Sequence, residues 1–192
     1  MRERAPRAPV EWGVATRCRR GEATSGDLGL VCVTPGGALV AGIDGLGHGI
    51  EAARAADTAG DVIRESASAD LGLLVERCHA ALKGTRGAAI SLAFISTSEG
   101  GLTWLGVGNV EGSLPLTNGI PGHELPRLRI AALDVQPGDV LVLATDGIES
   151  AFADSLDISG SPRAISERIL AGHWKPSDDA LVVAVRYLGV RP

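Results

Sequence analysis

Aromatic residues are scarce in this sequence: three Trp, two Phe and one Tyr make up 3% of its 192 residues. A packed interior must therefore be built from Ala, Val, Leu and Ile, and the hydrophobic fraction of 45% allows this. We interpret Trp12, Trp104 and Trp174 as packing residues. A chain of this length suits a single domain that buries about 70% of the surface exposed by its unfolded form.

Long apolar runs and excess positive charge are also missing. No stretch approaches the ~20 apolar residues of a membrane span, and the basic residues 1–7 are not followed by the apolar core of a signal peptide. The net charge of −5, without a basic stripe, disfavours a nucleic-acid partner. Cys18, Cys32 and Cys78 form no metal-ligand or disulfide pattern. We therefore expect a cytoplasmic protein with neither nucleic-acid nor membrane partners.

Short apolar runs separated by turn signals predict the secondary structure. Residues 1–10 are expected to form a loose arm before one domain over residues 11–192. Strands are predicted at residues 11–17, 28–34, 38–43, 88–96, 102–107, 110–116, 128–133, 140–145 and 180–187. Helices are predicted at about residues 51–68, 71–83 and 163–171, with a short one after Asp146-Gly147. Sequential strands with paired helices favour an α+β fold with antiparallel sheets over a doubly wound parallel sheet.

Aspartates stand at the edges of several predicted strands: Asp27, Asp44, Asp146, Asp178 and Asp179. Each one alone is compatible with an ordinary turn, since Asp and Asp-Gly are common turn signals. Hairpin turns should lead into a partner strand, yet both Asp-Gly pairs, at Asp44 and Asp146, are followed by helical sequence. The set as a whole therefore favours carboxylates that converge on one site.

A converging carboxylate cluster would need positive charge or protons. Two unit charges ~4 Å apart at an effective dielectric constant of ~20 repel by about 4 kcal/mol. Several such pairs would exceed the ~5–15 kcal/mol net stability of a typical domain. Oxygen ligands without His or Cys select hard cations such as Mg²⁺ or Mn²⁺. Two such ions can bridge a water molecule, lower its pKa and orient it for in-line attack on phosphorus.

Five segments occur in the order typical of one enzyme family: Ser25-Gly26-Asp27, Gly42-Ile43-Asp44-Gly45-Leu46-Gly47-His48-Gly49, Gly106-Val107-Gly108-Asn109, Ala144-Thr145-Asp146-Gly147-Ile148 and Ser177-Asp178-Asp179-Ala180. In these segments, which span nearly the whole chain, the sequence resembles the protein phosphatase 2C superfamily, in particular its bacterial sporulation-phosphatase branch. Arg77-Cys78, Lys83, Arg86-Gly87-Ala88 and Gly108-Asn109-Val110 resemble the stand-alone stressosome feedback serine phosphatases within that branch.

The resemblance implies a compact αββα sandwich of two antiparallel sheets. The segment before the Asp146 strand is short, so we expect no room for the flap of many relatives. It also implies a site for two Mn²⁺ or Mg²⁺ ions, held by Asp27, Asp44, the Gly45 carbonyl, Asp146 and Asp178, with Asp179 as an open alternative to Asp178. Asp44 and Asp146 are the candidate catalytic residues. Water would attack phosphoserine or phosphothreonine directly. The implied partners are phosphorylated stressosome proteins or anti-sigma-antagonist (STAS) domains.

The sequence departs from the family pattern at two functional positions. Leu46 stands where eukaryotic members have a proposed acid histidine, and His48, two residues later, is either that acid or a helix-cap residue. The phosphate-binding arginine has three candidates, Arg17, Arg19 and Arg20, which also read as a solvated charge run. The family's usual Thr after the final Asp pair is also replaced, by Ala180-Leu181. This altered final motif and the missing arginine leave a second function open, a catalytically weak docking module of a regulatory assembly. A metal-dependent nuclease is disfavoured by the net charge.

Overall fold

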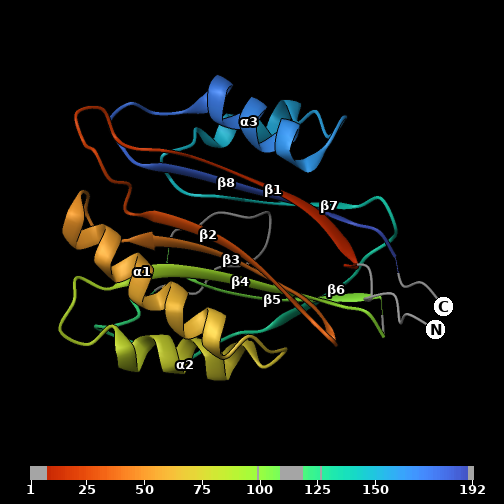
Figure 1. Ribbon diagram of the computed structural model, residues 1–192, viewed down its shortest axis with the longest axis horizontal. Helices are drawn as coiled ribbons and strands as arrows, with labels where there is room; N and C mark the ends of the chain where they lie inside the picture. The colour runs from red at the N-terminus through yellow and green to blue at the C-terminus, as the bar shows by residue number, and fades with distance from the viewer. Residues whose placement is uncertain (1–7, 99, 109–118, 126, 190–192) are drawn as a thin grey trace, which may run out of the picture.

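Two antiparallel β-sheets stack face to face and carry helices on both outer faces (Figure 1). The computed structural model describes residues 8–98, 100–108, 119–125 and 127–189. The strands are β1 (Val10–Arg17), β2 (Asp27–Thr34), β3 (Gly37–Gly45), β4 (Ala88–Ser96), β5 (Gly101–Val107), β6 (Ala131–Asp134), β7 (Val140–Ala144) and β8 (Ala180–Tyr187). The helices are α1 (Ile50–Glu65), α2 (Leu71–Ala81), α3 (Pro162–His173) and the 3₁₀ helix η1 (Ser150–Ser155).

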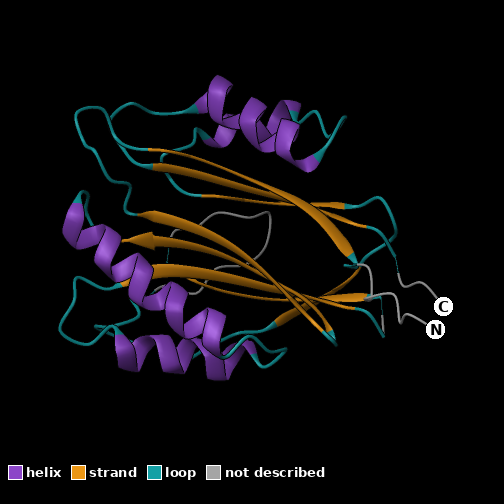
Figure 2. Ribbon diagram, in the orientation of Figure 1, coloured by secondary structure: helices purple, strands orange, loops and turns teal. Residues whose placement is uncertain are grey.

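The two sheets differ in size and in the helices that cover them. One sheet has the strand order β2-β3-β4-β5-β6, and the other has the order β1-β8-β7. Helices α1 and α2 lie on the outer face of the five-stranded sheet, and α3 lies on the outer face of the three-stranded sheet (Figure 2). The α+β class and the αββα sandwich predicted from the sequence are confirmed.

Most predicted elements are present, with shifts at their ends. The strands β4 and β8 have the predicted bounds, whereas β6 begins at Ala131 because Leu128 packs on the core from an irregular segment. The short helix expected after Asp146-Gly147 is η1. The strand β1 begins at Val10, the last residue of the expected arm. Three predictions fall wholly or partly outside the described residues. They are the arm at residues 1–7, the strand at residues 110–116, and the absence of a flap as far as it concerns residues 109–118.

The strand β3 is covered on both faces, which explains why its sequence is almost continuously apolar. Leu39, Ala41 and Ile43 pack toward α1 and α2. Ala38 and Val40, on the opposite face, pack against the three-stranded sheet. Because successive side chains of a strand alternate between faces, a strand covered on both sides must be apolar throughout. By the same alternation, Asp44 near the end of β3 points into the space between the sheets.

Side-chain caps define the starts of two helices. The Asp70 carboxylate accepts the Leu73 N–H at 2.9 Å at the start of α2, and the Ser161 hydroxyl accepts the Ala164 N–H at 3.2 Å at the start of α3. Such caps satisfy backbone donors that have no partner within the helix. Within the described residues, no helix has both the length and the apolar composition that crossing a membrane requires.

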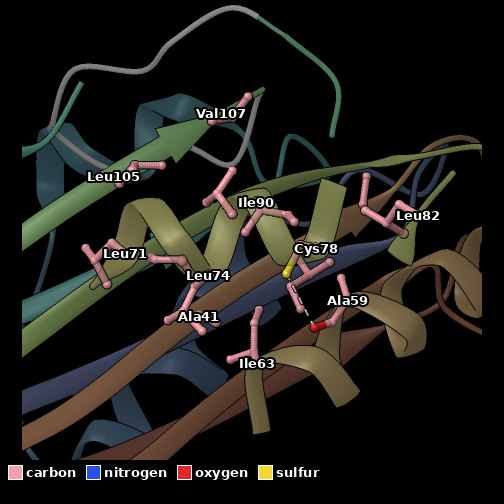
Figure 3. Packing of buried hydrophobic residues seen from close by; sticks show 14 of the residues in the cluster. Ala41, Ala59, Ile63, Leu71, Leu74, Cys78, Leu82, Ile90, Leu105 and Val107 are labelled. Atoms are coloured by element: carbon pink, nitrogen blue, oxygen red, sulfur yellow. Dashed lines mark hydrogen bonds between the residues drawn. The ribbon is translucent and has the colours of Figure 1, made fainter. Parts of the chain in front are cut away.

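Small residues let α1 and α2 approach one another closely. The buried face of α1 carries mostly alanine, and in Figure 3 the Cys78 thiol of α2 reaches the Ala59 carbonyl oxygen of α1, with 3.8 Å between sulfur and oxygen. Trp104 is fully buried between the sheets and Trp174 packs on the α3 side, as expected for packing residues. The interpretation is wrong for Trp12, which is 43% exposed because β1 is an edge strand.

Candidate metal and phosphate site

Asp27 and Asp44 form a directly opposed pair on neighbouring strands. In the register of β2 and β3, Asp27 is the cross-strand partner of Asp44. Opposed side chains of an antiparallel pair point to the same face, with Cβ atoms about 4.5–5.5 Å apart. By the alternation along β3, that face is the one on which Val40 packs against the other sheet. Both carboxylates therefore lie at one end of the sandwich, between its two layers.

The three-stranded sheet contributes two more aspartates at the same end. Asp146 follows β7 by two residues and Asp178 precedes β8 by two residues. Since β7 and β8 are antiparallel neighbours, the end of one strand lies beside the start of the other. Asp44, Asp146 and Asp178 line a common surface hollow of about 270 Å³. Its remaining lining residues are Arg19, Leu46, Gly47, His48 and Ser177.

Thr145 connects the two sheets at the base of the site. Its hydroxyl donates to Asp27 Oδ2 at 2.7 Å, and its oxygen accepts the Leu181 N–H at 2.8 Å. The side chain is only 1% exposed. Sequence reasoning gave Thr145 no role of its own beyond ending a strand and standing in a family segment. A signal was present, because Leu141 and Leu143 alternate into the space between the sheets and position 145 continues that series with a polar residue.

Burial and mutual repulsion raise the pKa of two of these aspartates. The pKa of Asp27 is raised to about 8, chiefly by burial and next by the negative charge of Asp44, while the hydrogen bond from Thr145 lowers it. The pKa of Asp178 is raised by burial and then by Asp146, against lowering effects of the hydrogen bond from the Asp179 N–H and, more weakly, of Arg19. Both shifts mean that this end of the sandwich favours neutralised carboxyl groups, and a bound cation would have the same effect as protons.

The donor set fits hard divalent cations in its chemistry. Every candidate side-chain ligand offers carboxylate oxygen, the donor preferred by Mg²⁺ and similar ions. Within the ranges the structure describes, no three His, Cys, Asp or Glu side chains are already grouped closely enough to hold an ion as they stand. A Cβ at Gly45 would lie 2.1 Å from the Ala52 carbonyl oxygen, so the backbone at this candidate ligand tolerates no side chain. The ligand set Asp27, Asp44, Gly45, Asp146 and Asp178 stays a prediction.

Asp178 and Asp179 have different surroundings. Asp178 lines the hollow and accepts the Asp179 N–H with Oδ1 at 2.9 Å. Asp179 is 3% exposed, and its two oxygens accept backbone N–H groups, Oδ1 from Arg19 at 2.7 Å and Oδ2 from Gly26 at 2.8 Å. Of the two, Asp178 is the one that faces the hollow, which favours it as the ligand candidate.

The structure also separates the candidate arginines and places His48. Arg19 lines the hollow, whereas the Arg17 guanidinium stacks over the Trp174 ring at 4.7 Å from its centroid. His48 lines the hollow too, and its Nδ1 lies 2.7 Å from a carboxylate oxygen of Glu22. Arg19 is therefore the arginine of the three that shares the hollow with the aspartates.

Comparisons with known proteins place this arrangement in a family. A solved structure described as "The bacterial stressosome: a modular system that has been adapted to control secondary messenger signaling" superposes with a TM-score of 0.86 at 32% identity, covering 92% of this chain and 99% of that chain. The phosphoserine phosphatase RsbX of Bacillus subtilis (strain 168) is 29% identical over 115 residues, which are 55% of this chain and 58% of that protein.

Two further solved structures have the same fold. RsbX in complex with magnesium superposes with a TM-score of 0.81 at 24% identity, covering 92% of this chain and 94% of that chain. The PP2C phosphatase domain of SpoIIE from Bacillus subtilis superposes with a TM-score of 0.72 at 19% identity, covering 95% of this chain and 64% of that chain. The chain belongs to the protein phosphatase 2C superfamily. Models of known protein families were also compared with the chain, and none matches.

Membership of the phosphatase 2C superfamily accounts for the location of the aspartates. The four superfamily segments that contain aspartate lie on β2, β3, β7 and β8 or directly beside them, so the sandwich brings their acidic residues to one end. The alignment with RsbX spans little more than half of either protein.

Proposed function

We propose that the chain is a metal-dependent protein serine/threonine phosphatase. The observation that carries the proposal is that Asp27 and Asp44 oppose each other on one sheet while Asp146 and Asp178 approach the same end from the other sheet. Mutual repulsion in such a group needs compensation, and oxygen donors suit Mn²⁺ or Mg²⁺. The RsbX relative is named a phosphoserine phosphatase, which supports the same reaction here.

In this proposal acidic residues at this end of the sandwich are the metal ligands. Asp27, Asp44, Asp146, Asp178 and the Gly45 carbonyl hold two Mn²⁺ or Mg²⁺ ions. These ions would supply positive charge that lowers the pKa of a water molecule and offsets the charge of the phosphoryl group. Asp44 and Asp146 come from different sheets and both line the hollow, so both reach the place where the phosphoryl group would bind.

Arg19 is the residue we assign to the phosphate itself. Its side chain lines the hollow together with the acidic residues, and a guanidinium group can donate two parallel hydrogen bonds to phosphate oxygens. A cation beside the carboxylates also limits their repulsion, in line with its lowering effect on the pKa of Asp178. The substrate's phosphate would thus bind between Arg19 and the metal ions.

We propose phosphorylated STAS domains or other stressosome proteins as the substrates, and the cytoplasm as the compartment. The similarity to a stressosome structure and to RsbX supports the partner class. The three cysteines form no disulfides, which suits a reduced compartment. Leu46 and Gly47 line one side of the hollow, and a phosphoserine on the surface of a folded domain would approach from that side.

A phosphate-release assay on a phosphorylated STAS domain tests the proposal. We expect release that requires added Mn²⁺, stops with EDTA, and is lost in Asp44→Asn while the circular-dichroism spectrum stays native. Asp61→Asn is the matched control, because Asp61 is exposed on α1 and pairs with Arg64 one turn further along the same helix. Full activity of Asp44→Asn would refute the mechanism. Absence of Mn²⁺ binding at millimolar concentration would favour the docking-module alternative.

A further inference from the structure

We propose that Asp179 is a positioning residue that fixes Arg19 at the phosphate end of the site by holding both ends of the β1–β2 connection. The inference rests on the proposed function, because it assigns Arg19 to the phosphate. It differs from the family resemblance, which left Asp179 only as an alternative metal ligand.

The β1–β2 connection, residues 18–26, crosses from the three-stranded sheet to the five-stranded sheet. Figure 1 shows it at the end of the sandwich opposite the chain termini. Arg19 lies where the chain leaves β1 and Gly26 where it enters β2. Their backbone N–H groups donate to the two oxygens of one carboxylate, Asp179, across 160 and 153 positions of sequence. One side chain therefore binds the backbone at both ends of the connection.

The surroundings of Asp179 leave little room for another arrangement. The side chain is 3% exposed, and hydrogen bonds to a charged acceptor are stronger than those between neutral groups. A Cβ at Gly26 would lie 3.3 Å from Asp179 Oδ2, and a Cβ at Gly147 would lie 1.8 Å from the Asp179 carbonyl oxygen. The glycines on both sides let the backbone pack closely against Asp179. This packing restricts the position of the Asp179 carboxylate.

The other contacts of the connection are more exposed or longer. The Arg20 N–H donates to the Pro176 carbonyl oxygen at 3.1 Å. The carboxylate of Glu22 contacts His48, but 33% of the Glu22 side chain and 48% of the His48 side chain are exposed. Exposed ion pairs contribute little to stability. The buried double hydrogen bond of Asp179 is therefore the contact that determines where the Arg19 backbone lies.

This geometry makes Asp179 act on phosphate through Arg19. A side chain that binds substrate must be held within about 0.5 Å of its productive position by supporting residues. Arg19 lines the hollow, while the Asp179 carboxylate is turned toward the Arg19 and Gly26 amides. Loss of the double hydrogen bond should thus weaken phosphate binding and leave the affinity for metal ions, which Asp178 would determine, largely intact.

The main variant is Asp179→Asn, which keeps the shape but replaces one accepting oxygen with an NH₂ group facing a backbone donor. We expect the KM for the phosphorylated STAS domain and the inhibition constant of inorganic phosphate to rise about tenfold, the effect of losing one strong hydrogen bond. The Mn²⁺ dissociation constant should change less than about threefold. Asp178→Asn is the matched control, and it should weaken Mn²⁺ binding by at least about tenfold.

A double-mutant comparison tests whether the effect passes through Arg19. In an Arg19→Ala background, Asp179→Asn should have no further effect on inhibition by inorganic phosphate. Additive losses would overturn the proposal. So would a loss of Mn²⁺ affinity in Asp179→Asn equal to that in Asp178→Asn, because Asp179 would then be a metal ligand.

Hydrogen exchange of the unmodified chain gives a test that needs no folded variant and no substrate. The Arg19 and Gly26 amides should exchange at least about tenfold more slowly than the Thr24 amide of the same connection, because they are bonded to a buried carboxylate. Equal exchange rates would overturn the proposal. If the chain released no phosphate from any substrate, the proposed function would fail, whereas slow exchange at these two amides would still support the role of Asp179 in holding the connection.

Discussion

Asp27 and Asp44 face each other across the β2–β3 ladder, the only position of that ladder where both partners are acidic. Like charges at opposed positions destabilise a sheet. All other positions of the two strands are apolar, glycine or threonine. Asp27 and Asp44 are therefore the only charged pair in a ladder whose other side chains mostly pack in the core. Repulsion between the two carboxylates therefore destabilises the sheet at the end where the candidate metal site lies.

This cost predicts that Asp27→Asn stabilises the metal-free protein. The pKa of Asp27 is raised to about 8 from an ordinary value of 3.8. Because the folded chain then keeps a proton that the unfolded chain releases, stability should fall as pH rises from about 4 to about 8. In EDTA, the unfolding midpoint of Asp27→Asn should exceed that of the unmodified protein by several degrees at pH 8 and by less at pH 5.

The same variant should lose the stabilisation that Mn²⁺ provides. A ligand at a hundred times its Kd stabilises a folded protein by about 2.7 kcal/mol, so Mn²⁺ should raise the midpoint of the unmodified protein more than that of Asp27→Asn. Asp57→Asn, an exposed position on α1, serves as the control. A variant that is less stable than the unmodified protein in EDTA at pH 8 would contradict the repulsion argument.

Thr145→Val should weaken the contact between the sheets. The change removes the donor to Asp27 and leaves the buried Leu181 N–H without its acceptor, at a cost of about 1–3 kcal/mol. Thr145→Ser keeps the hydroxyl and loses one methyl group, at a cost of about 1 kcal/mol. Urea titrations compare the two free energies of unfolding, and an equal loss in both variants would show that the hydroxyl contributes nothing.

Gly147→Ala should be severely destabilising. The added Cβ would lie 1.8 Å from the Asp179 carbonyl oxygen, a backbone atom that cannot rotate away. Overpacking of this kind costs typically about 1–3 kcal/mol and can cost more. The control is Gly172→Ala, where no atom lies within 4 Å of the added Cβ near the end of α3, and where alanine favours the helix. In thermal unfolding, Gly147→Ala should lower the midpoint and Gly172→Ala should raise it slightly. Similar midpoints for the two variants would argue against the close approach at Gly147.

Cys78 should resist alkylation in the folded protein. Burial raises the pKa of its thiol to about 12, and the side chain is fully buried between α1 and α2. The thiolate is the reactive form, so iodoacetamide at pH 8 should modify Cys78 only when denaturant is added. Mass spectrometry of the digested protein can locate the label, with the partly exposed Cys18 as the internal comparison. Rapid labelling of Cys78 without denaturant would contradict the tight packing of the two helices.

The fold could be predicted from local patterns to a large extent. Turn signals between apolar runs located most strands, and the paired helical segments indicated helices stacked on antiparallel sheets. The start of β6 was misplaced because Leu128 is apolar for core packing and not for strand pairing. Trp12 was misread because sequence does not reveal which strand forms a sheet edge.

The amino-acid sequence by itself determined the acidic residues at strand ends, the order of the superfamily segments and the oxygen-only chemistry of the candidate site. Only the tertiary structure decided that Asp178 faces the hollow while Asp179 binds the backbone, that Arg19 is the arginine beside the aspartates, and that Thr145 bonds Asp27. The reason is physical: Thr145 and Asp27 are 118 positions apart and lie on different sheets. Contacts of that kind depend on how the layers pack, which no local periodicity encodes.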